Sequence, residues 1–122
     1  FKVLGIDNNF RKYFFGADGS TLWMKNFLKK KYKKKYIHFN TDIRKFKDIE
    51  KIFAKHKKKI KVIIHSAAQP SHDWAALYPE IDFEINALGT LNILKLTKKY
   101  LPKNTPFIFM STNKVSGVIG KT

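Results

Sequence analysis

Short apolar runs alternate along the chain with longer segments in which apolar residues recur every three or four positions. An apolar run with a β-branched centre is typical of a buried strand, and the wider spacing is typical of a helix with one apolar face. Residues 8–19 and 69–80 are rich in Gly, Pro, Ser or Asp and are expected to be loops. Strands are expected at 1–7, 36–40, 59–68 and 107–111, and helices at about 21–33, 45–58 and 81–100.

The order of the expected elements is strand, helix, strand, helix, strand, helix, strand. Continuous apolar strands that alternate with helices favour a parallel sheet covered on both faces. Neither a repeat nor a linker interrupts the pattern. The sequence therefore predicts one α/β unit.

The composition excludes several classes of protein. A chain of 122 residues with 43% hydrophobic and 15% aromatic residues is expected to form a small globular domain, not a disordered segment. No apolar run approaches the roughly 20 residues that cross a bilayer, so no membrane partner is expected. Cysteine is absent, which excludes a disulfide framework and a thiolate metal site. These features suit a cytoplasmic protein.

The net charge of +16 raises the question of a nucleic-acid partner. However, 23 of the 25 basic residues are lysine, whereas base reading and bidentate phosphate contacts favour arginine. The lysine runs at 29–36 and 55–59 fall at expected helix ends, where cations offset the helix dipole. We interpret the charge as a solvated lysine-rich surface, and nucleic acid is not the expected partner.

Polar or small residues follow every expected strand. In parallel α/β sheets, ligands bind outside the carboxyl ends of the strands, so these residues are the candidates for a site. The residues at the four strand ends are Asp7 and Asn8, Asp42 and Ile43, Ser66 to Gln69, and Ser111 to Lys114.

The residue types at the first three strand ends suit the parts of a dinucleotide. Asp7 can accept bonds from both hydroxyls of a ribose, or it can simply begin a turn. Asp42 can contact an adenine edge, and it can also cap the helix that follows. Ala67 and Ala68 leave room for a flat or phosphorylated ligand against the backbone, although tight helix packing would require the same small residues.

Two further groups of polar residues are candidates. Asn86 lies among apolar neighbours, where its amide either bonds a loop carbonyl across the core or fixes the loops under a cofactor. His72 and Asp73 stand together in an expected loop and can orient a sugar hydroxyl, or they can be solvated. No metal site is expected, because the four histidines show no ligand spacing with carboxylates.

Taken in order, these motifs resemble the extended short-chain dehydrogenase/reductase superfamily, the NAD-dependent epimerases and dehydratases that modify nucleotide sugars. The segments DNN, DIR, HSAAQPSHDW, DFEINALGTLN and FMSTNKV carry the resemblance. Within the family, DNNFRKYFFGADGSTLW, AAQPSHDWA and STNKV are most similar to the branch of the CDP-paratose 2-epimerases. The resemblance covers residues 1 to about 115, whereas 116–122 form a divergent tail.

The resemblance implies a role for each residue at the strand ends. Asp7 and Asn8, with Arg11 nearby, would hold the adenosine ribose of NAD, and Asp42 with Ile43 would contact the adenine. The third strand end would run beneath the pyrophosphate and the nicotinamide ribose, and Asn86 would support it. The residues assigned to that strand end are Ser66, Ala67, Ala68 and Gln69.

The resemblance also implies the substrate side of the site. Ser111 would lie near the nicotinamide, and the hydroxyl of Thr112 would bond the sugar oxygen that is oxidised. Asn113 and Lys114 stand where related dehydratases carry Asp and Glu, which argues for an epimerase. With His72 and Asp73, they are assigned to binding of the nucleotide sugar.

The implied mechanism transfers a hydride from carbon 2 of the sugar to NAD and returns it to the other face. Alternatives are a reductase or 4-epimerase of the same superfamily, or a basic binding module without catalysis. The resemblance also implies a homo-oligomer.

The chain departs from the family pattern at two motifs. The Gly-rich pyrophosphate loop and the Y-x-x-x-K acid/base pair do not occur in it. We therefore expect a partial Rossmann-type doubly wound parallel sheet that lacks its first strand and the Gly-rich loop, and a piece inactive by itself. In the order 3-2-1-4-5 the missing strand is the middle one. The 1–7 strand should then pair with 36–40, the 60–66 segment with 107–111, and a gap should separate the two pairs.

Overall fold

The structure is a computed structural model that describes residues 1–111. Four strands alternate with helices along the chain, as the apolar pattern predicted. The strands are β1 (Val3–Ile6), β2 (Tyr36–Phe39), β3 (Ile63–His65) and β4 (Phe107–Phe109). The helices are α1 (Arg11–Phe15), α2 (Leu22–Tyr32), α3 (Phe46–His56), α4 (His72–Leu77), α5 (Pro79–Phe83) and α6 (Thr90–Tyr100).

Three short helical segments complete the described chain. Ala17–Gly19 and Lys33–Lys35 are 3-10 turns, and Glu84–Gly89 is a π-helical segment that joins α5 to α6. The expected helix at 81–100 is therefore confirmed as a helical stretch. It begins earlier, at Pro79, and it widens in its middle.

The strands form two separate parallel pairs. β1 pairs with β2 from Val3 opposite Tyr36 to Ile6 opposite Phe39, and β3 pairs with β4 from Ile63 opposite Phe107. Among residues 1–111 no ladder joins the two pairs. The predicted pairing and the predicted gap are both confirmed, and the fold class is α/β with parallel sheets.

Two expected loops contain helices, so these two predictions were wrong. Within 8–19, Arg11–Phe15 forms α1, because Phe14 is buried in the core and its ring packs edge-on against Trp74 at 5.3 Å. Within 69–80, His72–Leu77 forms α4, and the Ser71 side chain accepts a bond from the Trp74 backbone N–H at its start. Both helices depend on contacts with residues distant in sequence.

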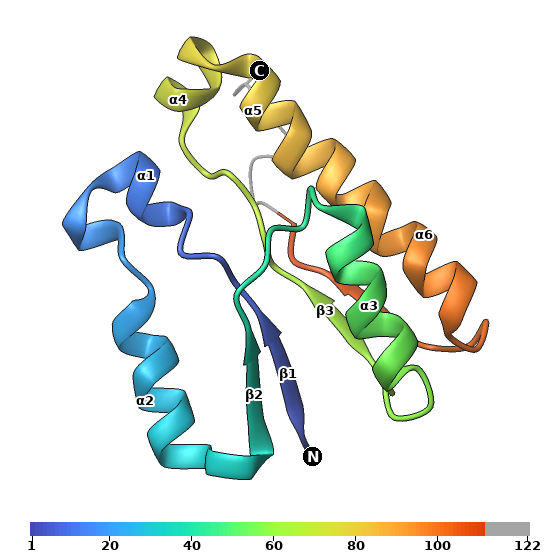
Figure 1. Cartoon of the computed structure of the whole chain (residues 1–122). Coiled ribbons are helices and arrows are strands. Elements are labelled where there is room, and N and C mark those ends of the chain that lie inside the picture. The colour runs from blue at the N-terminus through green and yellow to red at the C-terminus, as the bar shows by residue number, and fades with distance from the viewer. Residues whose placement is uncertain (112–122) are drawn as a thin grey trace, which may run out of the picture.

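The apolar core is formed mainly by side chains of the helices and of the segments next to them. Figure 1 shows α1 and α2 on one side of the β1–β2 pair, and α3 with α6 on the other side. Ile6 of β1, and Ile63 and Phe107 of the other pair, pack against this core. The core therefore bridges two strand pairs that share no hydrogen bonds. Its buried members are Phe14, Ile43, Ile49, Phe53, Ile85, Ile93, Leu96 and Leu101.

Candidate functional site

A cavity of about 210 Å³ lies where the carboxyl ends of β1, β2 and β3 meet. The parallel direction of the strands brings their carboxyl ends to one edge, which is why segments distant in sequence share this cavity. Apolar side chains from β1, α1 and the π-helical segment complete its wall. The cavity unites eight of the predicted site residues: Asp7, Asn8, Arg11, Asp42, Ile43, Ser66, Ala67 and Ala68.

The carboxylate of Asp7 is held at the rim of the cavity by two hydrogen bonds. Its Oδ1 accepts from the Asn9 backbone N–H at 2.8 Å and from the Thr21 hydroxyl at 2.8 Å. The first bond is the turn that the sequence allowed for. Both bonds fall on Oδ1, so among the described residues Oδ2 remains available to a ligand hydroxyl.

Asn9 and Thr21, which no sequence motif marked as site residues, shape this corner. Asn9 has φ 60°, a left-handed conformation that Asn tolerates better than most residues. Its Oδ1 accepts from the Thr21 backbone N–H at 2.7 Å and from the Ser20 hydroxyl at 3.2 Å. This fastens the start of α2 to the loop after β1, and the only signal in the sequence was a second Asn after Asp7.

Asp42 is engaged by Arg44 and Asn8. Arg44 Nη2 lies 2.7 Å from Asp42 Oδ2, the Arg44 backbone N–H donates to Oδ1 at 2.9 Å, and Asn8 Nδ2 donates to Oδ2 at 3.1 Å. Partial burial opposes ionisation of Asp42, but the bonds and charge of Arg44 outweigh it and hold the pKa of Asp42 below its ordinary value. Asp42, which lines the cavity, is therefore ionised.

The alternative that Asp42 caps the next helix was wrong. α3 begins at Phe46, and its N-cap residue, Lys45, makes no side-chain cap bond. Asp42 instead closes a tight turn onto the Arg44 backbone. Arg44 also pairs with Glu84 at 3.0 Å and lies over the Phe10 ring at 4.9 Å, so it ties the loop after β2 to two neighbouring segments.

The loop after β3 is clamped from the π-helical segment. Asn86 Oδ1 accepts from the Gln69 backbone N–H at 2.9 Å, and Asn86 Nδ2 donates to the Gln69 carbonyl at 3.2 Å and to Asp82 Oδ1 at 2.9 Å. Gln69 is buried, and its own amide donates to the same Asp82 oxygen at 3.0 Å. The predicted contact of Asn86 with a loop carbonyl is therefore present, although neither Asn86 nor Gln69 lines the cavity.

A buried histidine lies under this clamp. The Thr90 hydroxyl donates to the Asn86 carbonyl at 2.6 Å, so His65 Nε2, 2.8 Å from the same hydroxyl, must carry a proton and donate to it. Burial lowers the pKa of His65. His65 thus supports the clamp as a neutral ring, a role that the sequence pattern did not reveal.

Acidification is expected to destabilise the fold through its histidines. Burial is the largest cause of the lowered pKa of His65, and also of His38 and His56. Below about pH 6.5 the histidines of the unfolded chain bind protons that the native chain does not bind. The free energy of unfolding therefore decreases as the pH is lowered through this range, and above it the histidines no longer make stability depend on pH. Urea unfolding at about pH 7.5 and about pH 5.5 measures the loss.

The variant His65→Gln provides the control for this pH dependence. It removes the most buried of the three titrating rings and keeps a side-chain donor for Thr90. Its loss of stability on acidification should be smaller than that of the unchanged chain. An equal loss in both proteins would show that His65 does not titrate on unfolding.

The remaining predicted residues lie outside the cavity or outside the described chain. His72 and Asp73 are exposed at the start of α4 and do not line the cavity, and Ser111 is exposed beyond β4. Thr112, Asn113 and Lys114 lie outside the described residues. Among residues 1–111, no three His, Asp or Glu side chains gather as metal ligands would, and no helix has the length and apolar character to cross a membrane.

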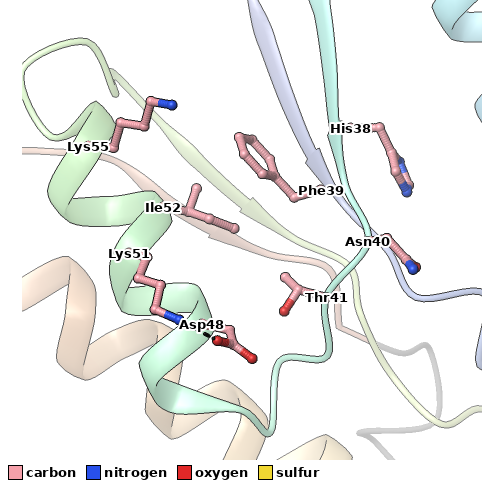
Figure 2. Close-up of a pocket in the computed structure, with 8 residues that line it drawn as sticks. All are labelled: His38, Phe39, Asn40, Thr41, Asp48, Lys51, Ile52 and Lys55. Carbon is pink, nitrogen blue, oxygen red and sulfur yellow. Dashed lines mark hydrogen bonds and ion pairs between the residues drawn. The ribbon is translucent and has the colours of Figure 1, made fainter.

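A second, larger cavity of about 380 Å³ lies between β2 and α3 (Figure 2). Phe39 and Ile52 face each other across it, and Lys51 pairs with Asp48 at 3.0 Å on its wall. That pair satisfies its own charges, and His38 and Asn40 point to the side of β2 away from Phe39 and Ile52 (Figure 2), so few polar groups converge on a ligand here. The cavity at the strand ends is the better candidate site.

Comparison with known proteins identifies the family. Residues 15–121 match the sequence model of the NAD dependent epimerase/dehydratase family. The chain belongs to this family. The resemblance inferred from the motifs is thereby confirmed, and the family name implies a nicotinamide dinucleotide as cofactor.

Two relatives show how much of a family member the chain represents. It is 33% identical over 118 residues to the CDP-paratose 2-epimerase of Salmonella typhi, covering 94% of this chain and 30% of that protein. Its fold is similar to that of the UDP-Glc/GlcNAc 4-epimerase from Campylobacter jejuni, with a TM-score of 0.66 and 18% identity over 88% of this chain and 29% of that structure. The chain thus spans about three-tenths of the length of either relative.

Proposed function

We propose that the chain provides the adenosine-binding half of an NAD site in a nucleotide-sugar epimerase similar to the CDP-paratose 2-epimerases. The observation that carries the proposal is the cavity at the strand ends, which the carboxylate of Asp7 and the small side chains of Ala67 and Ala68 share. A carboxylate suits a pair of ribose hydroxyls, and a wall without bulky side chains suits a pyrophosphate that lies along the backbone. The residues present therefore fit the cofactor.

Each wall of the cavity would hold one part of NAD. Asp7 and Asn8 bind the ribose hydroxyls, with Arg11 beside them. Ile43 contacts the adenine, and Asp42, fixed by Arg44, accepts from its amino group. Ser66 to Ala68 lie beneath the pyrophosphate and the nicotinamide ribose, and the Asn86–Gln69 clamp keeps that loop in place.

The substrate side of the proposal rests on the family resemblance. NAD, when bound, would supply the hydride chemistry: it would accept the hydride of carbon 2 of the sugar and give it back to the opposite face of the ketone, while the Y-x-x-x-K pair, which this chain does not contain, would take and return the hydroxyl proton. Thr112 donates its hydroxyl proton in a bond to the oxygen on that carbon, and Ser111 lies beside the nicotinamide. His72, Asp73, Asn113 and Lys114 are proposed to bind the nucleotide sugar.

The choice of an epimerase over a dehydratase depends on two residues. Asn113 and Lys114 lack the carboxyl groups with which a dehydratase removes water from the sugar. The identity to a CDP-paratose 2-epimerase supports that substrate class over a 4-epimerase or a reductase. The absence of cysteine suits a cytoplasmic location, and the family resemblance suggests a homo-oligomer.

A chimera tests the proposed function, because the 122 residues contain neither the Gly-rich loop nor the Y-x-x-x-K pair and are not expected to turn over substrate by themselves. The chain replaces the matched segment of the Salmonella typhi relative. The chimera should bind NAD and convert CDP-paratose to its carbon-2 epimer, with no action on UDP-glucose. A folded chimera that binds NAD and epimerises only UDP-glucose at carbon 4 would refute the substrate assignment, and one that does not bind NAD would refute the site.

Replacing Asp7 with alanine in this chimera should weaken NAD binding and leave turnover at saturating NAD nearly unchanged. Loss of a charge-assisted hydrogen bond costs about 1.5–3 kcal/mol, and no reacting atom lies near the ribose that Asp7 would hold. Calorimetry gives the affinity. Asp18→Ala is the matched control, because Asp18 is exposed in a neighbouring turn and does not line the cavity. Equal NAD affinity in the two variants would contradict the role of Asp7.

A further inference from the structure

The fold gathers three lysine runs at the edge opposite the candidate site. In a parallel unit each helix ends where the next strand begins, so α2, α3 and α6 all deliver their carboxyl ends to the amino-terminal edge of the strands (Figure 1). The runs are 29–35 with six lysines, 55–61 with five and 98–103 with three. Every lysine in them is exposed. We name these three runs together the lysine edge.

Contacts join the second and third runs of the lysine edge. Lys57 and Lys99 lie over the same ring, that of Tyr100, at 5.8 Å and 5.1 Å from its centroid. The pKa of His56 is lowered mainly by burial and further by the charges of Lys55, Lys59 and Lys2. Lys2, which precedes β1, is therefore close enough to the end of α3 to act on His56. Tyr36, directly after the first run, pairs with Val3, so Lys2, next to Val3, places that run near the end of α3.

Carboxylates do not neutralise the lysine edge. Among the described residues, Lys99 alone of these lysines forms an ion pair, with Glu50 at 2.7 Å. The acidic side chains Asp7, Asp42 and Glu84 lie at the opposite edge, around the loops that follow the strands. The two edges of the molecule therefore carry charge of opposite character.

The helix dipole accounts for only part of this charge. Its effect is confined to the last helical turn, whereas Lys33–Lys35 follow α2, and Lys57 to Lys61 follow the end of α3 at His56. Like charges crowded together oppose folding unless counterions or an anionic partner screen them. The lysines that lie beyond the helix ends thus point to a polyanionic partner.

Composition alone did not favour a nucleic-acid partner, but the gathering of the three runs at one edge changes that expectation: we propose that the lysine edge binds single-stranded nucleic acid without sequence preference. Lysines are point charges suited to phosphates but poor at reading base edges, which fits a backbone contact. Aromatic rings among them can stack unpaired bases: Tyr32 is 44% exposed and Phe27 is 49% exposed, and Lys31 lies 5.5 Å and 5.3 Å from their ring centroids. Proteins that bind single-stranded nucleic acid combine cationic groups for the phosphates with exposed aromatic rings for the bases.

The binding test uses the unmodified 122-residue chain and a fluorescent oligothymidine of about 20 nucleotides, followed by anisotropy across a salt series. The variant Lys57→Gln/Lys58→Gln/Lys59→Gln removes three cations from the lysine edge. Each phosphate contact contributes about 0.7 to the salt slope for a single strand, so the slope should fall by about 2 and the affinity at about 0.1 M salt by roughly 100-fold. The control Lys12→Gln/Lys45→Gln/Lys47→Gln loses the same charge near the other edge and should keep its affinity within about threefold.

Three outcomes would overturn the proposal. An equal loss in both triple variants would show that net charge alone attracts the strand. Binding to phosphatidylserine vesicles without binding to the oligonucleotide would assign the lysine edge to a lipid surface. Unchanged affinity in Tyr32→Leu, where loss of one stacked base predicts at least about a fivefold decrease, would exclude a partner with unpaired bases. None of these measurements involves NAD, so they are independent of the proposed epimerase activity.

Discussion

Replacing Thr112 with alanine in the chimeric epimerase is expected to lower kcat about 100- to 1000-fold and to leave NAD affinity unchanged. Removing one preorganised donor to the reacting oxygen typically costs about 2.7–4 kcal/mol in the transition state. Most of the residues proposed to hold NAD line the cavity at the ends of β1, β2 and β3, and after β4 it is Ser111 that is assigned to the nicotinamide, whereas Thr112 is assigned to the sugar. Loss of its hydroxyl should therefore act on the chemical step alone.

The control for this experiment is Thr112→Ser, which keeps a hydroxyl at the same position and should retain most of the turnover. NAD binding is measured in parallel by calorimetry on all three proteins. If the alanine variant kept its rate, or if the serine variant fell as far as the alanine variant, a catalytic hydroxyl at Thr112 would be refuted. The pair of results also separates this residue from Asp7, whose loss should appear in NAD affinity and not in kcat.

The sequence predicted the strands and their pairing because those features depend on local periodicity and on general topology. The largely apolar run 36–40 predicted a strand, and Tyr36–Phe39 is a strand in the structure, although it is half-buried and not covered on both faces. The gap followed from strand order, without any knowledge of side-chain contacts. The structure differs at α1 and α4, where five and six residues become helical. Helices this short depend on tertiary contacts, here the bond from Trp74 Nε1 to the Phe14 carbonyl at 3.0 Å.

The candidate site could likewise be predicted only in part from the sequence. Residues directly after a strand, such as Asp7 and Asp42, could be predicted because parallel strands deliver their ends to one edge. Their partners could not be predicted, since each is set by the folded geometry. Arg44 reaches Glu84 forty positions away in sequence, and Asn9 holds Thr21 twelve positions away. No periodic pattern encodes such pairs.

The core that bridges the two strand pairs is where a single substitution should cost most stability. Residues of β1, β3 and β4 share no ladder across the gap, but all pack against the cluster that α3 and α6 bury. Leu96 in α6 is fully buried in that cluster, with a relative exposure of 0%. Leu96 therefore belongs to the cluster against which residues of both strand pairs pack.

Leu96→Ala is therefore expected to lower the free energy of unfolding by about 2–5 kcal/mol, because it removes buried methyl groups and leaves a cavity. That is a large part of the roughly 5–15 kcal/mol that stabilises an ordinary domain, so the variant should show partial unfolding at moderate temperature. Leu94→Ala is the matched control: the same residue type in the same helix, 44% exposed, should change stability by no more than about 0.5–1 kcal/mol. Urea unfolding followed by circular dichroism measures both. Equal destabilisation by the two variants would mean that the buried face of α6 does not hold the strand pairs together.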